Sequence, residues 1–429
     1  MRTSKKAIQV PRDIVISHVY SSDNKGDAAL TSVLIQDLRQ RFRGANLAIL
    51  KLEAAAKDAH FEGVPEKDSF MYYALNKYRN PLVKLLYTTY MIAATLSWAG
   101  WRRLTGLHLY LPAHLREVAY IYEQADLIVA VGGGYLRSRK GLVNRLNVPL
   151  LLHPLLFGYI LGKPTVLYPQ SVGPFVNGFE GSLVAFVLRR LMLIVLREDT
   201  SVTLLSRLGV RQNVVRSIDS GFLLRTSHKL DIHKTYHIPA DKLIVGVTVR
   251  AWLSGKAQVA YERAVAEALD DVVERFGAHI LFIPQVTAAK GDDDRVVSRR
   301  VHWYMKHAAE ATTINSQPDH HQIKAIYDGL DALLGTRFHS VIFSLTSYVP
   351  VLAIEYEHKT SGIMHDLGLD KWVIKIEDAA AADLAAAMHN LLEHSTQYKS
   401  YLRAHVPPYV QKARQTISMV AQSYDSLQN

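Results

Sequence analysis

Arg337 and His339 lie in the segment 335–340, which reads GTRFHS and follows an apolar run. Residues 331–335 (DALLG) predict a buried strand, and residues 340–348 (SVIFSLTSY) predict a short apolar helix. In this strand–loop–helix arrangement the two side chains lie beside a helix N-terminus, where free N–H groups and the helix dipole favour an anion. The spacing therefore predicts a ligand that bears phosphate or carboxylate, with a structural ion pair or a helix cap as the alternative role.

A second polar group follows the next predicted strand. Residues 355–362 read EYEHKTSG, so Glu355 and Glu357 share one face of an extended segment near His358 and Lys359. We expect the two carboxylates either to hold hydroxyl groups of a ligand or to orient His358.

Two further arginines end predicted strands. Arg250 follows the apolar run IVGVT and is expected to point into a ligand cleft, with a solvated strand end as its alternative role. Arg197 ends the run LIVL, and Glu198 and Asp199 are available to neutralise it.

Two other motifs are less specific. The three aspartates at 292–294 are acidic enough to suggest a metal, but no histidine at ligand spacing accompanies them. We expect a solvated loop there and predict no metal. Gly132–Gly134 would allow a phosphate or sugar to approach the backbone, but the full dinucleotide fingerprint is missing and a tight turn fits equally well.

Five segments together make the sequence similar to the polysaccharide pyruvyl transferase family. They match the family's motifs in the family's order, and the resemblance covers roughly residues 14–400. The segments are NKGD at 24–27, VGGG at 131–134, QSVGP at 170–174, GTRFHS at 335–340 and EYEHKTSGIM at 355–364.

The resemblance implies transfer of the enolpyruvyl unit of phosphoenolpyruvate onto two sugar hydroxyls as a cyclic ketal. Guanidinium groups suit the donor's carboxylate and phosphate, and a histidine suits the proton transfers. No cofactor is implied beyond this donor substrate. The expected catalytic residues are His339 and Arg337. The expected donor-binding residues are Arg337, Arg250, Ser340, Arg197 and Lys359, and the expected acceptor-binding residues are Asn24, Asp27, Gly133, Gln170, Glu355, Glu357 and His358.

Apolar strands alternate with amphipathic helices, as in parallel sheets covered on both faces. Strands are expected at 14–19, 47–52, 125–131, 165–168, 193–197, 244–249, 279–283, 312–315, 332–335 and 351–355. Asp27 is expected to cap a helix at 28–42, or to bind a sugar hydroxyl or act as a base. The fold class predicted is α/β with two Rossmann-like domains facing a cleft, as in the glycosyltransferase-B architecture.

A polar stretch at 223–242 without sustained periodicity indicates the domain boundary. We predict an N-terminal, acceptor-binding domain at 1–235 with an apolar insert at about 65–120. The C-terminal, donor-binding domain is predicted at 236–429.

Composition limits the class of protein. The chain has 429 residues, of which 49% are apolar, a formal net charge of +11 and no cysteine. It is therefore long enough for two cores, is attracted to acidic partners and contains no disulfide. No RNP motif, zinc-finger spacing or helix-turn-helix pattern is present, so nucleic acid is not an expected partner.

Residues 85–101 (LLYTTYMIAATLSWAGW) are free of charge and are flanked by Lys84 and by Arg102 and Arg103. The run is short for a membrane span and fits either a buried helix or an interfacial element on a membrane surface. Residues 10–13 (VPRD) interrupt any apolar core of a signal peptide. We therefore expect a cytoplasmic protein, with contact to the inner face of the membrane through 85–101 as the further alternative.

Two other functions remain open from the sequence. A nucleotide-sugar glycosyltransferase would use the same two-domain architecture, because fold does not fix function. A non-catalytic, membrane-surface subunit of glycan assembly would account for residues 85–101 and the positive charge. The sequence leaves the acceptor sugar and the oligomeric state undetermined.

Overall fold

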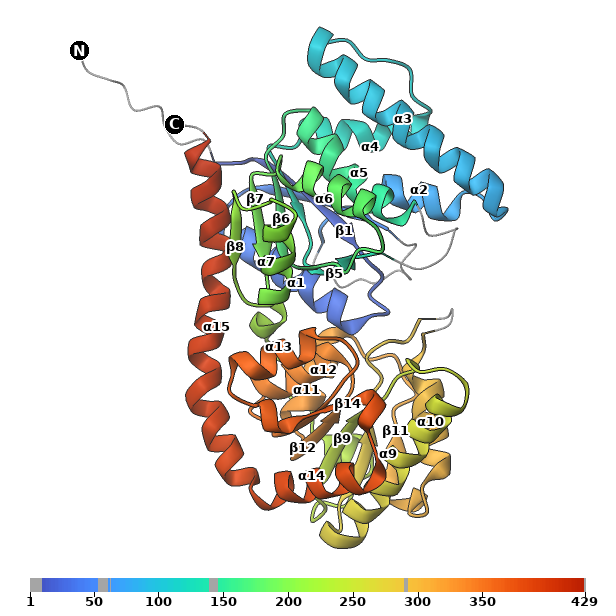
Figure 1. The fold of residues 1–429 in the computed structure, drawn as a ribbon. Coiled ribbons are helices and arrows are strands. Elements are labelled where there is room, and N and C mark those ends of the chain that lie inside the picture. Colours follow the sequence, from blue (N-terminus) through green and yellow to red (C-terminus); the bar gives the residue numbers. More distant parts are fainter. Residues whose placement is uncertain (1–9, 53–60, 62, 139–145, 289–291, 428–429) are drawn as a thin grey trace, which may run out of the picture. The chain divides into compact units, whose positions relative to one another are not determined.

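The computed structural model describes residues 10–52, 61, 63–138, 146–288 and 292–427. The chain folds into two compact units (Figure 1). The first unit comprises residues 1–21, 30–220 and 412–429, and the second comprises 22–29 and 221–411. The main division between the units thus lies after Ser220, whereas the sequence analysis predicted a single boundary at 235. In addition, residues 22–29 belong to the second unit and residues 412–429 belong to the first.

The first unit contains an eight-stranded parallel sheet of order β3-β2-β1-β4-β6-β7-β8, with β5 paired to β6. The apolar runs predicted as strands from 14 to 197 all form part of this sheet. The strands are β1 (Asp13–Val19), β2 (Asn46–Lys51), β3 (Glu66–Asp68), β4 (Leu127–Ala130), β5 (Gly133–Leu136), β6 (Thr165–Val172), β7 (Leu193–Leu196) and β8 (Val214–Arg216).

Helices cover both faces of this first sheet. Successive side chains of a strand point to opposite sides, so an apolar strand has apolar side chains on both faces that helices must cover. In β1, Ile14 and Ile16 pack with Leu34 of α1 and Val420 of α15, whereas Val15 packs with the cluster formed by the other helices. The helices are α1 (Lys25–Arg41), α2 (Phe70–Asn76), α3 (Pro81–Thr105), α4 (Ala113–Gln124), α5 (Asn147–Ile160), α6 (Gly178–Leu188), α7 (Asp199–Arg207) and the end of α15 (Ser395–Ser426).

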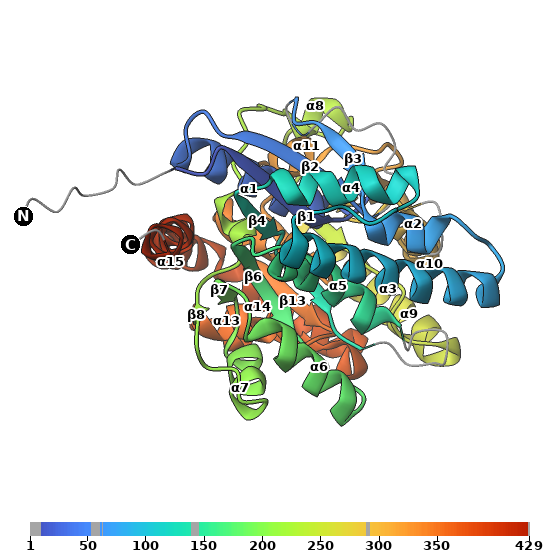
Figure 2. The same cartoon turned by 90° about the horizontal axis from the view of Figure 1, so that it is seen from above.

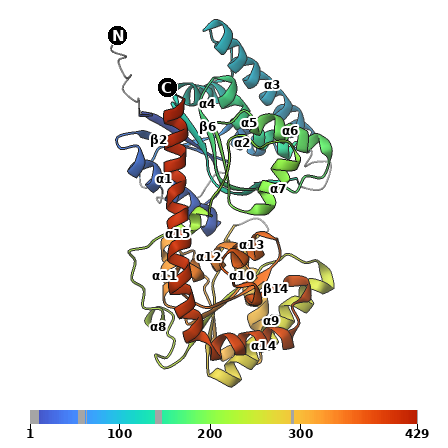
Figure 3. The same ribbon diagram turned by 60° about the vertical axis from the view of Figure 1, so that its left-hand side comes forward.

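The second unit contains a six-stranded parallel sheet of order β11-β10-β9-β12-β13-β14. Its strands are β9 (Ile244–Thr248), β10 (His279–Phe282), β11 (Ala311–Thr313), β12 (Ala332–Gly335), β13 (Val351–Glu355) and β14 (Val373–Lys375). Its helices are α8 (Ile232–Thr235), α9 (Gly255–Phe276), α10 (Asp294–Tyr304), α11 (His320–Asp328), α12 (Phe338–Thr346), α13 (Lys359–Asp366) and α14 (Ala381–Glu393). Figure 3 shows α9 and α14 side by side at one end of this unit.

The parallel arrangement determines where functional residues gather. All the strands of a parallel sheet end at the same edge, so the loops after neighbouring strands lie next to one another. In the second unit the loops after β10, β9, β12 and β13 are adjacent in that order. These four loops include Arg250, Arg337 and Lys359, which the sequence had selected.

Residues 85–101 lie within α3, which is longer at both ends than the charge-free run. The side of α3 that contains Met91, Thr95 and Trp98 is buried in the first unit. Among the helices that the structure describes, none combines the length and apolar content needed to cross a bilayer.

Candidate anion-binding site

Hydroxyl groups fix the turn between β12 and α12 against β9. Thr248 Oγ1 accepts hydrogen bonds from the N–H groups of Thr336, at 3.0 Å, and of Arg337, at 3.3 Å. It also lies 2.9 Å from Ser340 Oγ, which donates to the Arg337 carbonyl at 2.5 Å. Ser340 is fully buried. Its hydroxyl, which we predicted to bind the donor, therefore stabilises the turn that positions Arg337.

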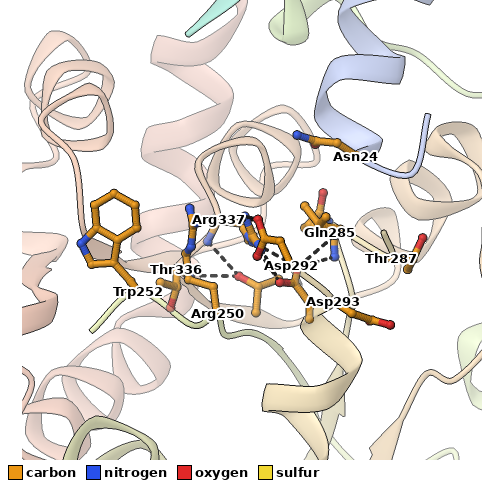
Figure 4. Close-up of polar contacts among 12 residues, drawn as sticks. Asn24, Arg250, Trp252, Gln285, Thr287, Asp292, Asp293, Thr336 and Arg337 are labelled. Carbon is orange, nitrogen blue, oxygen red and sulfur yellow. Dashed lines mark hydrogen bonds and ion pairs between the residues drawn. The ribbon is translucent and has the colours of Figure 1, made fainter. Parts of the chain in front are cut away.

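The Arg337 guanidinium is buried and makes charged hydrogen bonds to two aspartates (Figure 4). Its Nε donates to both oxygens of Asp294 at 3.1 Å, and a terminal nitrogen donates to Asp294 Oδ1 at 2.5 Å. The same nitrogen donates to Asp292 Oδ1 at 2.6 Å. Burial acts to lower the pKa of Arg337, but the two carboxylates outweigh it and raise that pKa. Arg337 therefore remains charged.

Asp294 also organises the loop that follows β10. Its Oδ2 accepts hydrogen bonds from the N–H groups of Gln285, at 3.0 Å, and Val286, at 2.9 Å. Burial raises the pKa of the Asp294 carboxyl, and Arg337 and the Val286 N–H counteract part of that rise. The predicted solvated loop at 292–294 is therefore wrong at Asp294, which is a buried structural partner of Arg337.

Asp292 differs from Asp294 because its side chain is 45% exposed. It lies between two arginines, at 2.6 Å from Arg337 and 3.7 Å from a terminal nitrogen of Arg250. Burial acts to raise the pKa of Asp292, but Arg337 outweighs it, with a smaller contribution from Arg250, and lowers that pKa. Two guanidinium groups from adjacent strands thus converge on one accessible carboxylate (Figure 4).

Aromatic rings hold Arg250 in place. Its guanidinium carbon lies 4.3 Å from the ring centroid of Tyr356 and 4.8 Å from that of Trp252. The Arg250 Nε is buried and has no hydrogen-bond partner among the described residues. A buried donor of this kind costs free energy until a ligand or water accepts from it, so Arg250 is oriented for an acceptor.

Lys359 and Tyr356 extend this cationic group toward α13. Lys359 forms an ion pair with Glu357 at 3.0 Å, and its Nζ lies 5.6 Å from the Tyr356 ring centroid. Burial acts to raise the pKa of the Tyr356 phenol. The positive charges of Lys359, Arg250 and Arg337 outweigh burial and lower it. The phenol is therefore surrounded by cations. Tyr356 was not among the site residues predicted from the sequence.

His339 occupies the second position of α12 and meets a segment from the start of the chain. That segment, 22–29, belongs to the second unit. It is attached to the loop after β10 because the N–H of Lys25 donates to the Gln285 carbonyl and the N–H of Thr287 donates to the Asp23 carbonyl, each at 2.9 Å. Gly26 then lies so close to His339 that a Cβ added there would overlap the imidazole ring. The glycine of the NKGD motif is therefore a close-contact residue for His339.

Gly26→Ala is expected to lower the stability of the protein. The added methyl group must displace either the His339 ring or the turn, and overpacking of this kind costs about 1–3 kcal/mol. The measurement is the midpoint of thermal unfolding. Gly362→Ala is the matched control, because nothing lies within 4 Å of a Cβ at Gly362. Equal midpoints for the two variants would contradict the close approach of Gly26 and His339.

The remaining predicted residues of this unit lie near the same edge. Asn24, rather than Asp27, caps α1, since its Oδ1 accepts from the Gly26 N–H at 3.1 Å. Asp27 lies in the first turn and accepts from the Asn24 side chain at 2.8 Å. Glu355 ends β13 and accepts from the Ser361 hydroxyl, while His358 is exposed at the start of α13.

Gly133, Gln170 and Arg197 lie at the carboxyl edge of the first sheet, on the other unit. Gly133 pairs with Gln170 in register and has a φ of 149°. Gln170 is fully buried, and neither its side-chain oxygen nor its nitrogen has a partner among the described residues. Arg197 donates to Ser171 Oγ at 2.7 Å and forms a buried ion pair with Asp219. The structure thus pairs Arg197 with Asp219, which the sequence analysis did not name among its neutralising residues.

Sequence reasoning missed the residues that orient the cations. Asp292 and Asp294 were taken for solvent-exposed charges, and Tyr356 and Trp252 were not selected. One signal was available, because acidic side chains favour helix starts and the three aspartates lie at the start of α10. Nothing in the local sequence indicates that their partner lies more than 40 residues further along the chain.

The two parallel-sheet units define an α/β protein of the glycosyltransferase-B type. A glycosyltransferase from Rickettsia africae has a similar structure, with a TM-score of 0.58 and 12% identity, over 97% of this chain and 98% of that one. The S. aureus MnaA–UDP complex has the same TM-score and identity over 92% of each chain. At such identities these likenesses show the fold alone.

Comparison of the amino-acid sequence with known families identifies the family. The family described as polysaccharide pyruvyl transferase matches residues 24–358, and the chain belongs to it. The amylovoran biosynthesis protein AmsJ of Erwinia amylovora is 27% identical over 301 residues, which are 67% of this chain and 70% of that protein. The resemblance inferred from the five motifs is confirmed.

Proposed function

We propose that the protein transfers the enolpyruvyl unit of phosphoenolpyruvate onto two hydroxyl groups of a saccharide in a bacterial-type polysaccharide or its lipid-linked precursor. A pyruvate ketal forms and phosphate is released. Family membership supports pyruvyl transfer. One observation supports an anionic donor: Arg337 and Arg250, from neighbouring strands, converge on the half-exposed carboxylate of Asp292. Absence of cysteine and a basic charge fit a cytoplasmic enzyme with an acidic substrate.

In this proposal the Asp292 carboxylate occupies the place of an anionic group of the donor. Guanidinium binds carboxylate and phosphate with the same paired geometry. When the donor enters, its carboxylate or phosphate replaces Asp292 between Arg337 and Arg250, and the buried Arg250 Nε gains an acceptor. Lys359 and the Tyr356 phenol lie beside the same cations and are suited to the second anionic group.

The chemistry needs one proton added and hydroxyl protons removed. A proton added to the methylene carbon of the donor makes its second carbon electrophilic. One sugar hydroxyl attacks that carbon, phosphate leaves, and the second hydroxyl closes the ketal. One of the two hydroxyl protons replaces the added proton, and the other leaves with the phosphate. His339, at the start of α12 and close to Arg337 in sequence, is the proposed group for these transfers, because histidine titrates near neutrality.

For the acceptor we propose hydrogen bonding by Gln170, Gly133, Asn24, Asp27, Glu355, Glu357 and His358. Gln170 has the strongest structural support, since its buried amide has no described partner and can both donate to and accept from sugar hydroxyls. Arg197, held by Asp219 and Ser171, supports that edge of the first sheet.

Calorimetric titration of the purified protein with phosphoenolpyruvate, and separately with uridine and guanosine diphosphate sugars, tests the proposed function. Saturable binding of phosphoenolpyruvate supports pyruvyl transfer. Binding of a nucleotide sugar alone would make the protein a glycosyltransferase instead. Binding of neither donor would favour a non-catalytic role in glycan assembly.

Asp292→Asn is expected to tighten phosphoenolpyruvate binding about threefold to tenfold. The substitution removes the carboxylate that competes with the donor for the two arginines, and a partly exposed ion pair contributes about 1 kcal/mol. The dissociation constant is measured by calorimetry. Asp293→Asn is the matched control, because Asp293 pairs with Arg295 at 2.7 Å instead. Weaker binding by Asp292→Asn would instead make Asp292 a required part of the site.

A further inference from the structure

α3 has an apolar stripe on the side opposite its buried face. The buried positions are Thr88, Met91, Thr95, Trp98 and Ala99. Side chains three or four positions apart lie on one face of a helix, and Leu86 (63% exposed) and Leu104 (85% exposed) lie on the opposite face. The exposed members of this α3 stripe are Leu82, Leu86, Tyr90, Ala93, Ser97, Trp101 and Leu104.

The stripe lies in a long stretch of the chain that contains basic residues but no acidic ones. Between Asp68 and Glu117 the sequence contains no acidic residue and six lysines and arginines. These are Lys77, Arg79, Lys84, Arg102, Arg103 and Arg116. Arg102 is paired with Glu123, and the Arg103 guanidinium lies against Gly162 at the end of α5. Both termini of the stripe are therefore flanked by cations.

Neighbouring helices of the same unit also expose aromatic side chains. α5 packs against both α3 and α6 (Figure 2). On α6, Phe179 and Phe186 are exposed, and on α5 Tyr159 is exposed. The Arg190 guanidinium lies 3.6 Å from the Phe186 ring centroid and 5.7 Å from that of Tyr159. Exposed aromatic rings paired with arginine are typical of side chains at a lipid–water interface.

We propose that the α3 stripe, with the adjoining faces of α5 and α6, docks on an anionic bilayer surface. α3 lies in the plane of the interface, with its apolar side chains among the acyl chains and its cations at the phosphate groups. The distance from Leu82 to Leu104 along the helix is ~33 Å at 1.5 Å per residue, so contact extends over many headgroups.

A second copy of the chain fits this surface less well. A symmetric dimer would place the same patch against itself, so the cations of one copy would meet those of the other. Residues 69–116 contain no acidic residue to neutralise them, and Glu123 already pairs with Arg102. An anionic lipid surface satisfies both the apolar stripe and its flanking charges. The proposal does not depend on the donor or the reaction.

Sedimentation of the full chain with vesicles tests the proposal. Vesicles of phosphatidylethanolamine with phosphatidylglycerol are compared with vesicles of phosphatidylcholine. The test variant combines Leu86→Glu, Trp101→Glu and Leu104→Glu. The matched control combines Val259→Glu, Val296→Glu and Trp303→Glu, which are exposed apolar residues of the second unit and change the net charge equally.

The unmodified protein and the control are expected to sediment with the anionic vesicles at least tenfold more than with the neutral ones. The α3 variant is expected to bind the anionic vesicles at least tenfold less than the unmodified protein, with an unchanged thermal unfolding midpoint. Equal binding by the α3 variant and the control would overturn the proposal. A concentration-dependent dimer in sedimentation velocity, abolished only by the α3 variant, would overturn it in favour of a second copy.

Discussion

Arg337→Ala is expected to weaken phosphoenolpyruvate binding roughly 10²-fold, because paired hydrogen bonds to a charged group contribute about 1.5–3 kcal/mol and every 1.4 kcal/mol is tenfold. The same change leaves Asp294 buried without its cation, and breaking such a pair costs about 3–5 kcal/mol of stability. Calorimetry gives the affinity, and thermal unfolding gives the stability.

Arg250→Ala separates these two effects. Within the part of the chain that the structure describes, the acidic partner of Arg250 is the half-exposed Asp292, so the loss of Arg250 leaves no buried charge unpaired there. It is expected to weaken donor binding at least tenfold with little change in the unfolding midpoint. Arg295→Ala, which removes an Arg–Asp pair in the same loop region, should leave affinity within about twofold. Unchanged affinity in both the Arg337 and Arg250 variants would place the donor elsewhere.

His339→Ala is expected to lower turnover by 10²-fold or more, on the order of general acid–base contributions. Donor affinity should change far less than turnover, because the arginines remain in place. Turnover is measured as phosphate released from phosphoenolpyruvate in the presence of acceptor. His365→Ala is the control, since His365 lies on α13, is exposed and pairs with Asp370. Undiminished turnover would leave His339 with a structural role only.

A double variant tests whether His339 and Gly26 act as neighbours. Gly26→Ala costs stability only while the imidazole occupies the adjoining space, so His339→Ala should remove that cost. The double variant is then expected to be about as stable as His339→Ala alone, and equally inactive. Such non-additivity is the signature of residues in contact.

Ten of the fourteen strands in the described residues could be predicted from the sequence, because buried parallel strands are continuous apolar runs such as IVGVT and LIVL. The short strands β3, β5, β8 and β14 were not predicted. Helix ends were harder to predict. Asp27 and Asn24 are both good capping residues, and only the contact of the Asn24 side chain with Gly26 decides between them. The length of α15 was not anticipated, since Pro407 and Pro408 interrupt its sequence pattern although the helix continues through them.

The cations of the site could be predicted from their positions at strand ends, but their partners could not. Arg337 is paired with Asp292 and Asp294 through the parallel order of β10, β9 and β12, a tertiary relation that local sequence does not encode. For Arg197 the nearest acidic residues in sequence were candidates, yet the buried ion pair is with Asp219, which follows the neighbouring strand β8. Pairing across strands outweighed proximity along the chain in both cases.

The exchange of segments between the two units has a genetic consequence. Residues 22–29 and 412–429 are each separated from their unit by a long stretch of the other one. No single cut in the gene can therefore separate the two units. A fragment beginning at 221 would include Arg337 and His339 but would lack Gly26 and the turn that His339 packs against. An exchange of one unit between relatives must therefore include its separated segment as well.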